Sequence, residues 1–160
     1  MSKVRFEFED VTVEERHALT ALCTEYVWRI DNGHAASVPA LFTLDGSMEL
    51  PWGTPKGASE LKAAWEERSK RAVRTRHMIS HLRFSRLGEA EIAGEVSITL
   101  YHADPEGPAP ATPAVVGEHI DVYRRDAGGR WRIHSRRFLP AFSSYAAIPV
   151  PDRTPSGATA

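Results

Sequence analysis

The residue that most clearly suggests chemistry is Asp31, an acid that ends an apolar helical stretch. The apolar residues before it recur at helical spacing and place its carboxylate at the edge of a buried face. Partial burial disfavours the charged form of a carboxyl, and the carbonyl end of a helix is unfavourable for an anion. If Asp31 is ionised at neutral pH, it therefore needs a partner that donates a proton or carries a positive charge. The alternative is that residues 31–33 only end the helix, with Gly33 in the left-handed conformation.

Histidines are the second group of candidates. His77 and His81 have the His-x-x-x-His spacing that can bind zinc from a helix. In a strand, this spacing separates the two residues by about 13 Å, at about 3.3 Å per residue. Because the surrounding residues predict a strand, we expect no metal site here.

A further polar group lies in a later predicted strand, where His119, Asp121 and Tyr123 share one face. These side chains either line a pocket or form a polar outer face of the sheet. Three tryptophans offer aromatic walls for a flat substrate, or else belong to the core. They are Trp28, Trp52 and Trp65.

The composition is that of an ordinary soluble protein of one domain: 160 residues, of which 42% are hydrophobic and 26% charged. The formal net charge of −1 argues against a nucleic-acid-binding protein. No apolar run approaches the roughly 20 residues that a membrane span needs, and residues 1–11 do not have the pattern of a signal peptide. The single Cys23 lies on the apolar helix stripe, which favours a core thiol over a nucleophile and fits a cytoplasmic protein.

A basic run follows the third predicted helix, and it either binds phosphate or RNA or forms a solvated face. A helix C-terminus attracts cations, and two glutamates dilute the positive charge, so the solvated face is the favoured interpretation. The sequence has no Gly-rich phosphate loop, nucleophile elbow or dinucleotide fingerprint. The run consists of Arg68, Lys70, Arg71, Arg74 and Arg76.

The first half of the chain is predicted to be mainly helical. Thr12 and Glu15 have the spacing of a capping box, which predicts that the first helix starts near residue 13. Pro and Gly residues after position 50 predict a loop before the third helix. The expected elements are a helix over 13–31, a short helix over 34–43, a strand over 44–51 and a helix over 58–73.

After residue 76 the period of the apolar pattern changes from 3.6 to 2, which predicts antiparallel strands joined by turns. Four prolines in residues 104–113 exclude a strand interior and predict an exposed loop. Helices followed by a run of strands indicate an α+β fold. The strands are expected over 76–86, 91–102, 114–125 and 130–139. Residues 1–148 are expected to form the domain, with 149–160 as a disordered or loosely attached tail.

Four short motifs in this order resemble those of the nuclear transport factor 2-like superfamily, and within it the SnoaL-like branch that includes scytalone dehydratase and polyketide cyclases. They are Tyr-x-Trp-x-x-Asp at 26–31, Leu-Phe-Thr-x-Asp-Gly at 41–46, Thr-Arg-His at 75–77 and Trp-Arg-Ile at 131–133. The resemblance implies a cone-shaped roll, in which a strongly curved, mostly antiparallel sheet wraps around the N-terminal helices and encloses a pocket. It also implies that Asp31 and His77 face each other in that pocket.

A carboxylate that accepts a hydrogen bond from one imidazole nitrogen fixes the tautomer, and the other nitrogen can then take or give a proton. We therefore expect a cofactor-free enzyme that uses Asp31 and His77 for dehydration, isomerisation or cyclisation of an apolar, oxygenated ring compound. The alternative is a non-catalytic ligand-binding module or an oxygenase small-subunit-like protein on the same fold. The sequence departs from the family pattern at His81 and His119, where many relatives have asparagine and tyrosine. The expected substrate-binding residues are Tyr26, Trp28, Trp52, Trp65, His81, His119 and Asp121, and the resemblance implies a homodimer.

Overall fold

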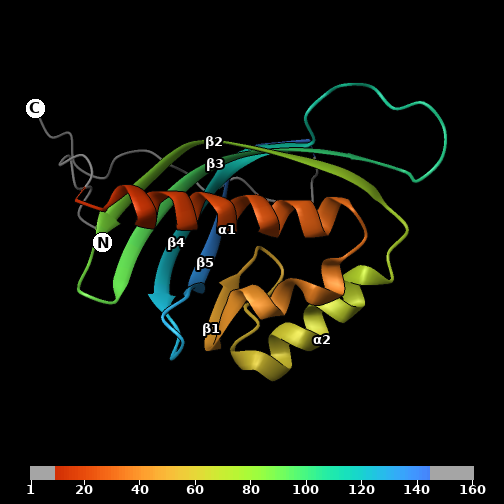
Figure 1. The fold of residues 1–160 in the computed structure, drawn as a ribbon. Coiled ribbons are helices and arrows are strands. Elements are labelled where there is room, and N and C mark those ends of the chain that lie inside the picture. The colour runs from red at the N-terminus through yellow and green to blue at the C-terminus, as the bar shows by residue number, and fades with distance from the viewer. Residues whose placement is uncertain (1–9, 145–160) are drawn as a thin grey trace, which may run out of the picture.

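The computed structural model describes residues 10–144, and Figure 1 shows their arrangement. The first helix, α1 (Val13–Asp31), has the bounds that the sequence predicts. The capping box is confirmed: the Glu15 N–H donates to Thr12 Oγ1 at 3.1 Å, and the Thr12 N–H donates to Glu15 Oε2 at 3.0 Å. Gly33 follows with a φ of 81°, a conformation that glycine adopts without strain.

The next three elements differ from the prediction. The second helix is a 3-10 helix, η1 (Ala35–Leu41), because Pro39 lies inside it and cannot donate the hydrogen bond of an α-helix. Strand β1 (Phe42–Glu49) therefore begins two residues earlier than expected. The third helix, α2 (Gly57–Ser69), ends four residues earlier than expected, and the chain after it turns into the sheet.

The remaining four strands form hairpins, as the alternating pattern predicts. They are β2 (Arg74–Arg86), β3 (Glu91–Ala103), β4 (Val115–Arg125) and β5 (Trp131–Ser143). Neighbours among them are antiparallel, and β1 pairs with β5 in parallel, which gives one open sheet in the order β1-β5-β4-β3-β2. Figure 1 shows β2 and β3 bending over α1, with α2 beside β1 at one end. The predicted α+β roll is therefore confirmed.

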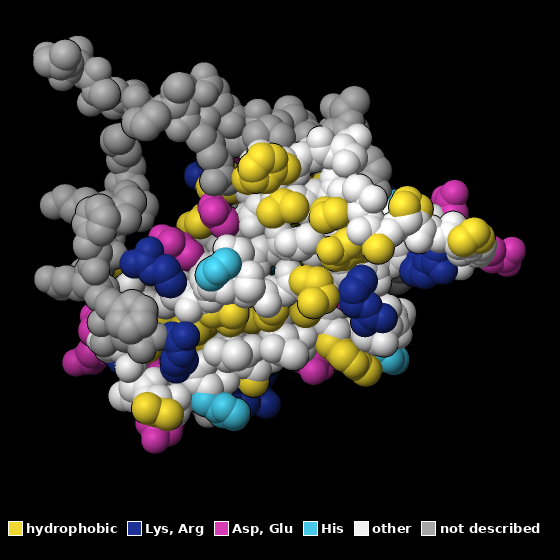
Figure 2. All heavy atoms as spheres, turned by 90° about the horizontal axis from the view of Figure 1, so that it is seen from above, with side chains coloured by type: hydrophobic (Ala, Val, Ile, Leu, Met, Phe, Trp, Pro, Cys, Tyr) yellow, Lys and Arg dark blue, Asp and Glu magenta, His cyan; other side chains and the backbone are white. Residues whose placement is uncertain are grey.

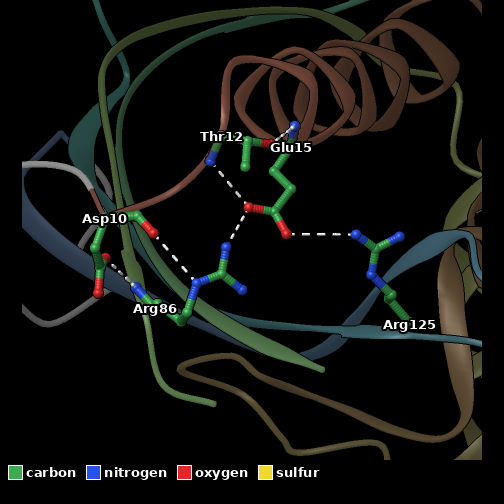
Figure 3. A network of polar contacts seen from close by, with 5 residues as sticks. All are labelled: Asp10, Thr12, Glu15, Arg86 and Arg125. Carbon is green, nitrogen blue, oxygen red and sulfur yellow. Dashed lines mark hydrogen bonds and ion pairs between the residues drawn. The ribbon is translucent and has the colours of Figure 1, made fainter. Parts of the chain in front are cut away.

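The two ends of α1 are tied to the two ends of β2. At the N-terminal end, Glu15 pairs with Arg86 and with Arg125, whose Nη2 lies 3.3 Å from Glu15 Oε1 (Figure 3). Asp10 accepts a further hydrogen bond from the Arg86 N–H at 2.7 Å. At the C-terminal end, Asp31 bonds to residues at the start of β2. The position of Asp31 relative to the sheet is thus fixed by contacts at both ends of the helix.

The core lies between the sheet and the helices α1, η1 and α2, and the surface carries charges of both signs. Figure 2 shows a face on which basic and acidic side chains both occur, with hydrophobic side chains in a band between them.

Residues 104–112, between β3 and β4, are exposed as expected, and Arg74 Nη2 holds this loop by donating to the Gly107 carbonyl at 2.9 Å. None of the described helices is long and apolar enough to cross a membrane. The predicted tail over 149–160 lies outside the described residues.

Candidate functional site

The structure brings Asp31 and His77 into direct contact. His77 Nδ1 lies 2.6 Å from Asp31 Oδ1, and the two side chains are 12% and 3% exposed for His77 and Asp31 respectively. The backbone N–H of His77 also donates to Asp31 Oδ2 at 2.7 Å, and the Thr75 hydroxyl donates to Oδ1 at 2.8 Å. The carboxylate of α1 therefore accepts three hydrogen bonds from the first residues of β2.

These contacts decide the charge of Asp31. Burial acts to raise the pKa of Asp31, but the hydrogen bonds from the His77 ring and backbone, with the charge of His77, lower the pKa below its ordinary value. Asp31 is therefore ionised at neutral pH and can only accept hydrogen bonds. Nδ1 of His77 must then carry the proton of the shared bond, which leaves Nε2 as the nitrogen that can exchange a proton.

His77 lies on the wall of a cavity of about 620 Å³ between α1, α2 and the sheet. A cavity of this size is in the range that binds small molecules. Three of the predicted aromatic residues, Tyr26, Trp52 and Trp65, line it. Most of the other lining residues are apolar, among them Ile30, Met48, Leu50, Ile98, Leu100 and Phe138.

Two polar groups that pack against each other line the same cavity. His119 on β4 packs edge-on against Tyr26 on α1, with ring centroids 5.8 Å apart. Burial, together with the charges of Arg136 and His77, lowers the pKa of His119 well below its ordinary value, so its imidazole is neutral at neutral pH. Burial raises the pKa of Tyr26 to about 12, so its hydroxyl keeps its proton. Both groups can therefore donate a hydrogen bond, and the Tyr26 hydroxyl donates to Met48 Sδ at 3.5 Å in this structure, a weak bond that a substrate oxygen could replace.

Asp121 does not line this cavity, because it is held in a buried ion pair behind it. Arg136 Nε and Nη2 donate to the two carboxylate oxygens at 2.8 and 2.6 Å, and Tyr123 donates to Oδ2 at 2.5 Å. The guanidinium of Arg136 lies 4.1 Å from the centroid of the Tyr26 ring. The polar face of β4 is thus turned inward, and its deeper part supports the cavity residues. We therefore remove Asp121 from the set of substrate-binding residues.

Two other predicted residues also lie outside the cavity. Trp28 is 50% exposed and stacks on His34, with ring centroids 5.3 Å apart, because it lies beyond the buried stripe of α1. His81 is exposed because the register of β2 shifts between Ser80 and Arg83, and its φ of 49° turns it away from the face that carries His77. In the described part of the chain, no group of three or more His, Cys, Asp or Glu residues is placed to hold a metal ion.

The sequence matches a known protein family over most of its length. Residues 11–137 match the model of the SnoaL-like domain. The chain belongs to the SnoaL-like domain family. The match includes Asp31, His77 and His119. No curated protein matches the sequence.

Solved structures similar to this SnoaL-like chain share its fold. A candidate scytalone dehydratase from Novosphingobium aromaticivorans is 18% identical, with a TM-score of 0.73 over 89% of this chain and 97% of that one. ActVI-ORFA from Streptomyces coelicolor is 19% identical, with a TM-score of 0.70 over 81% and 98%. The beta subunit of a candidate aromatic-ring-hydroxylating dioxygenase from N. aromaticivorans is 16% identical, with a TM-score of 0.72 over 84% and 94%.

Among the cavity residues that the sequence did not predict for this SnoaL-like domain are two arginines, Arg68 and Arg71. Both belong to the basic run that was interpreted as a solvated face. The sequence could have predicted the position of Arg68, because it follows Leu61 and Trp65 at helical spacing and so shares their side of α2. His102 at the end of β3 also lines the cavity, although it is exposed.

Proposed function

We propose that this protein is a cofactor-free enzyme that transfers protons on an apolar, oxygenated ring compound, in a dehydration, isomerisation or cyclisation. The observation that supports this most is the 2.6 Å contact between His77 Nδ1 and Asp31 on the wall of a mainly apolar cavity. A histidine oriented in this way can act as a general base and then as a general acid. Such a group typically contributes about 10²- to 10⁴-fold to the rate.

In the proposed reaction, Nε2 of His77 takes a proton from a carbon next to a carbonyl group of the substrate. Asp31 stabilises the imidazolium that forms, and the electron pair of the broken C–H bond moves toward the carbonyl oxygen. Tyr26 or neutral His119 donates a hydrogen bond to that oxygen. The imidazolium then returns its proton, either to a leaving hydroxyl, which departs as water, or to another carbon.

A non-catalytic ligand-binding module is the second candidate, because the fold is shared with the beta subunit of a candidate dioxygenase. Two variants separate the candidates: Asp31→Asn and His77→Gln. We expect both variants to lose turnover by about 100-fold or more with little change in affinity, as measured on a panel of cyclic hydroxyketones. His81→Gln is the matched control, since it makes the same change on β2 outside the cavity. Ligand binding without any turnover in the wild type would favour the binding module, whereas unchanged turnover in both variants would mean that the enzyme does not use Asp31 and His77.

Two further parts of this proposal concern assembly, which rests on family resemblance, and location, which rests on the single cysteine, Cys23. The protein is proposed to form a homodimer through the outer face of the sheet and to work in the cytoplasm. Analytical ultracentrifugation tests the first part, since a monomer at micromolar concentration would contradict it. Fractionation of the producing cells tests the second.

A further inference from the structure

The end of α2 places two cations on the wall of the cavity. Arg68 lies in the last turn of α2, and Arg71 follows two residues after the helix ends. Arg68 is partly buried, whereas Arg71 is exposed, so the pair marks the rim of the cavity. Figure 1 shows the chain running from the end of α2 into β2, the strand that carries His77. Arg68, Arg71 and His77 all line one cavity.

Neither guanidinium has a partner within residues 10–144. No hydrogen bond or ion pair is formed there by the side chain of Arg68 or Arg71. The nearest acids along the helix are paired with lysines instead: Glu67 Oε2 lies 3.1 Å from Lys70 Nζ, and Glu66 lies 3.7 Å from Lys62. The alkyl part of a surface arginine often packs on apolar residues, but here those residues form the wall of a cavity that a second arginine also lines.

The cavity wall also lacks a negative charge that faces the two arginines. No Asp or Glu is among its described lining residues, which include three histidines as well as Arg68 and Arg71. Asp31 is not among the lining residues, and both of its carboxylate oxygens accept hydrogen bonds from Thr75 and His77. Burial and the positive charge of Arg71 lower the pKa of Arg68 from its ordinary value, although Asp31 opposes this shift. The two cations repel each other at a partly desolvated position, and a bound anion would relieve this repulsion.

We propose that Arg68 and Arg71 bind a carboxylate of the substrate, while its ring occupies the apolar part of the cavity beside His77. This rests on the proposed function and specifies its substrate class as a ring compound that carries a carboxylate. The planar guanidinium matches a carboxylate through two parallel hydrogen bonds. A phosphate matches a guanidinium equally well, but its larger negative charge costs more to bring into a mainly apolar cavity at the C-terminal end of a helix, so we choose the carboxylate.

The test compares two probes that differ only in charge, 2-naphthoate and 2-naphthamide, by isothermal titration calorimetry on the full chain. Hydrogen bonds to charged groups predict that the wild type binds the carboxylate about tenfold more tightly than the amide. We expect this preference to fall with added salt, and to be lost in Arg68→Gln and reduced in Arg71→Gln. Lys70→Gln is the control, because it removes the same charge from the end of α2 but does not line the cavity. Arg71 is exposed, so its replacement also tests the inference if Arg68→Gln fails to fold.

Three results would overturn the inference: equal affinity of the wild type for both probes, a preference kept in both arginine variants, or no binding of naphthoate at millimolar concentration. The measurement does not depend on turnover, so it separates this inference from the proposed function. A carboxylate preference in a protein that shows no proton-transfer activity would keep the anion site and reject the enzyme. If the wild type shows activity that His77→Gln loses, but no preference for the carboxylate, the enzyme proposal is supported and the anion site is rejected.

Discussion

Replacement of Arg136 by Met should cause a large loss of stability, because it leaves a buried carboxylate without its cation. Arg136 and Asp121 have side chains that are 1% and 0% exposed, and two hydrogen bonds of 2.8 and 2.6 Å join them. Burial alone would lower the pKa of Arg136, but the charge of Asp121 raises the pKa well above its ordinary value. Removing one partner of such a pair costs about 3–5 kcal/mol, out of about 5–15 kcal/mol for a typical domain.

For a chain of this length, the loss corresponds to a fall in Tm of about 6–20 °C. The loss in unfolding free energy is measured by urea unfolding, followed by the fluorescence of the four tryptophans. Arg137→Met is the matched control on the next residue of β5, where the exposed pair with Glu49 at 3.3 Å contributes about 0–1 kcal/mol. If Arg136→Met were as stable as Arg137→Met, the argument from the buried pair would be wrong. The double variant Asp121→Leu/Arg136→Met should recover part of the loss, since it leaves no charge unpaired.

Two further predictions concern Asp31 and the packing of β3. Because the pKa of Asp31 is lower in the folded than in the unfolded chain, its stabilising contribution is complete above about pH 4–5 and is lost as the pH falls through the folded pKa. The difference in unfolding free energy between the wild type and Asp31→Asn should therefore shrink from pH 6 to pH 2 in urea titrations, and a constant difference would count against the hydrogen-bonded carboxylate. Gly94→Ala would place a Cβ 2.5 Å from Cε2 of buried Tyr123, so we expect a cost of about 1–3 kcal/mol in the same assay. Gly88→Ala, with no atom within 4 Å of the added Cβ, should have little effect, and equal stability of the two variants would contradict the packing argument.

Local signals were sufficient to predict most elements of this fold. The capping box and the apolar stripe define α1 to the residue, and the change of period predicts β2 to β5 to within a few residues at each end. The contact between Asp31 and His77 was not derivable from spacing, because it joins residues 46 positions apart. It followed from the family resemblance, and the structure supplies the reason, since α1 is tied to both ends of β2.

The errors arise where orientation depends on irregular backbone or on tertiary contacts. His81 was assigned to the cavity from its position in the family pattern, whereas the register of β2 shifts beside it and its side chain is exposed. Trp28 was assigned as an aromatic wall of the pocket, whereas its ring is half exposed and stacks on His34. Arg68 was missed because a charged residue near a helix end was interpreted as solvated, although its helical position placed it beside Trp65.

The most direct test of the proposed chemistry is proton transfer at carbon. The rate of deuterium incorporation next to the carbonyl of 2-tetralone, a bicyclic ketone, can be followed by NMR in heavy water with the wild type, His77→Gln and the control His81→Gln. We expect the wild type and His81→Gln to accelerate exchange above the buffer rate, and His77→Gln to lose about 10²- to 10⁴-fold of that acceleration. Exchange at the buffer rate in the wild type, or equal acceleration by His77→Gln, would contradict the role proposed for the Asp31–His77 pair.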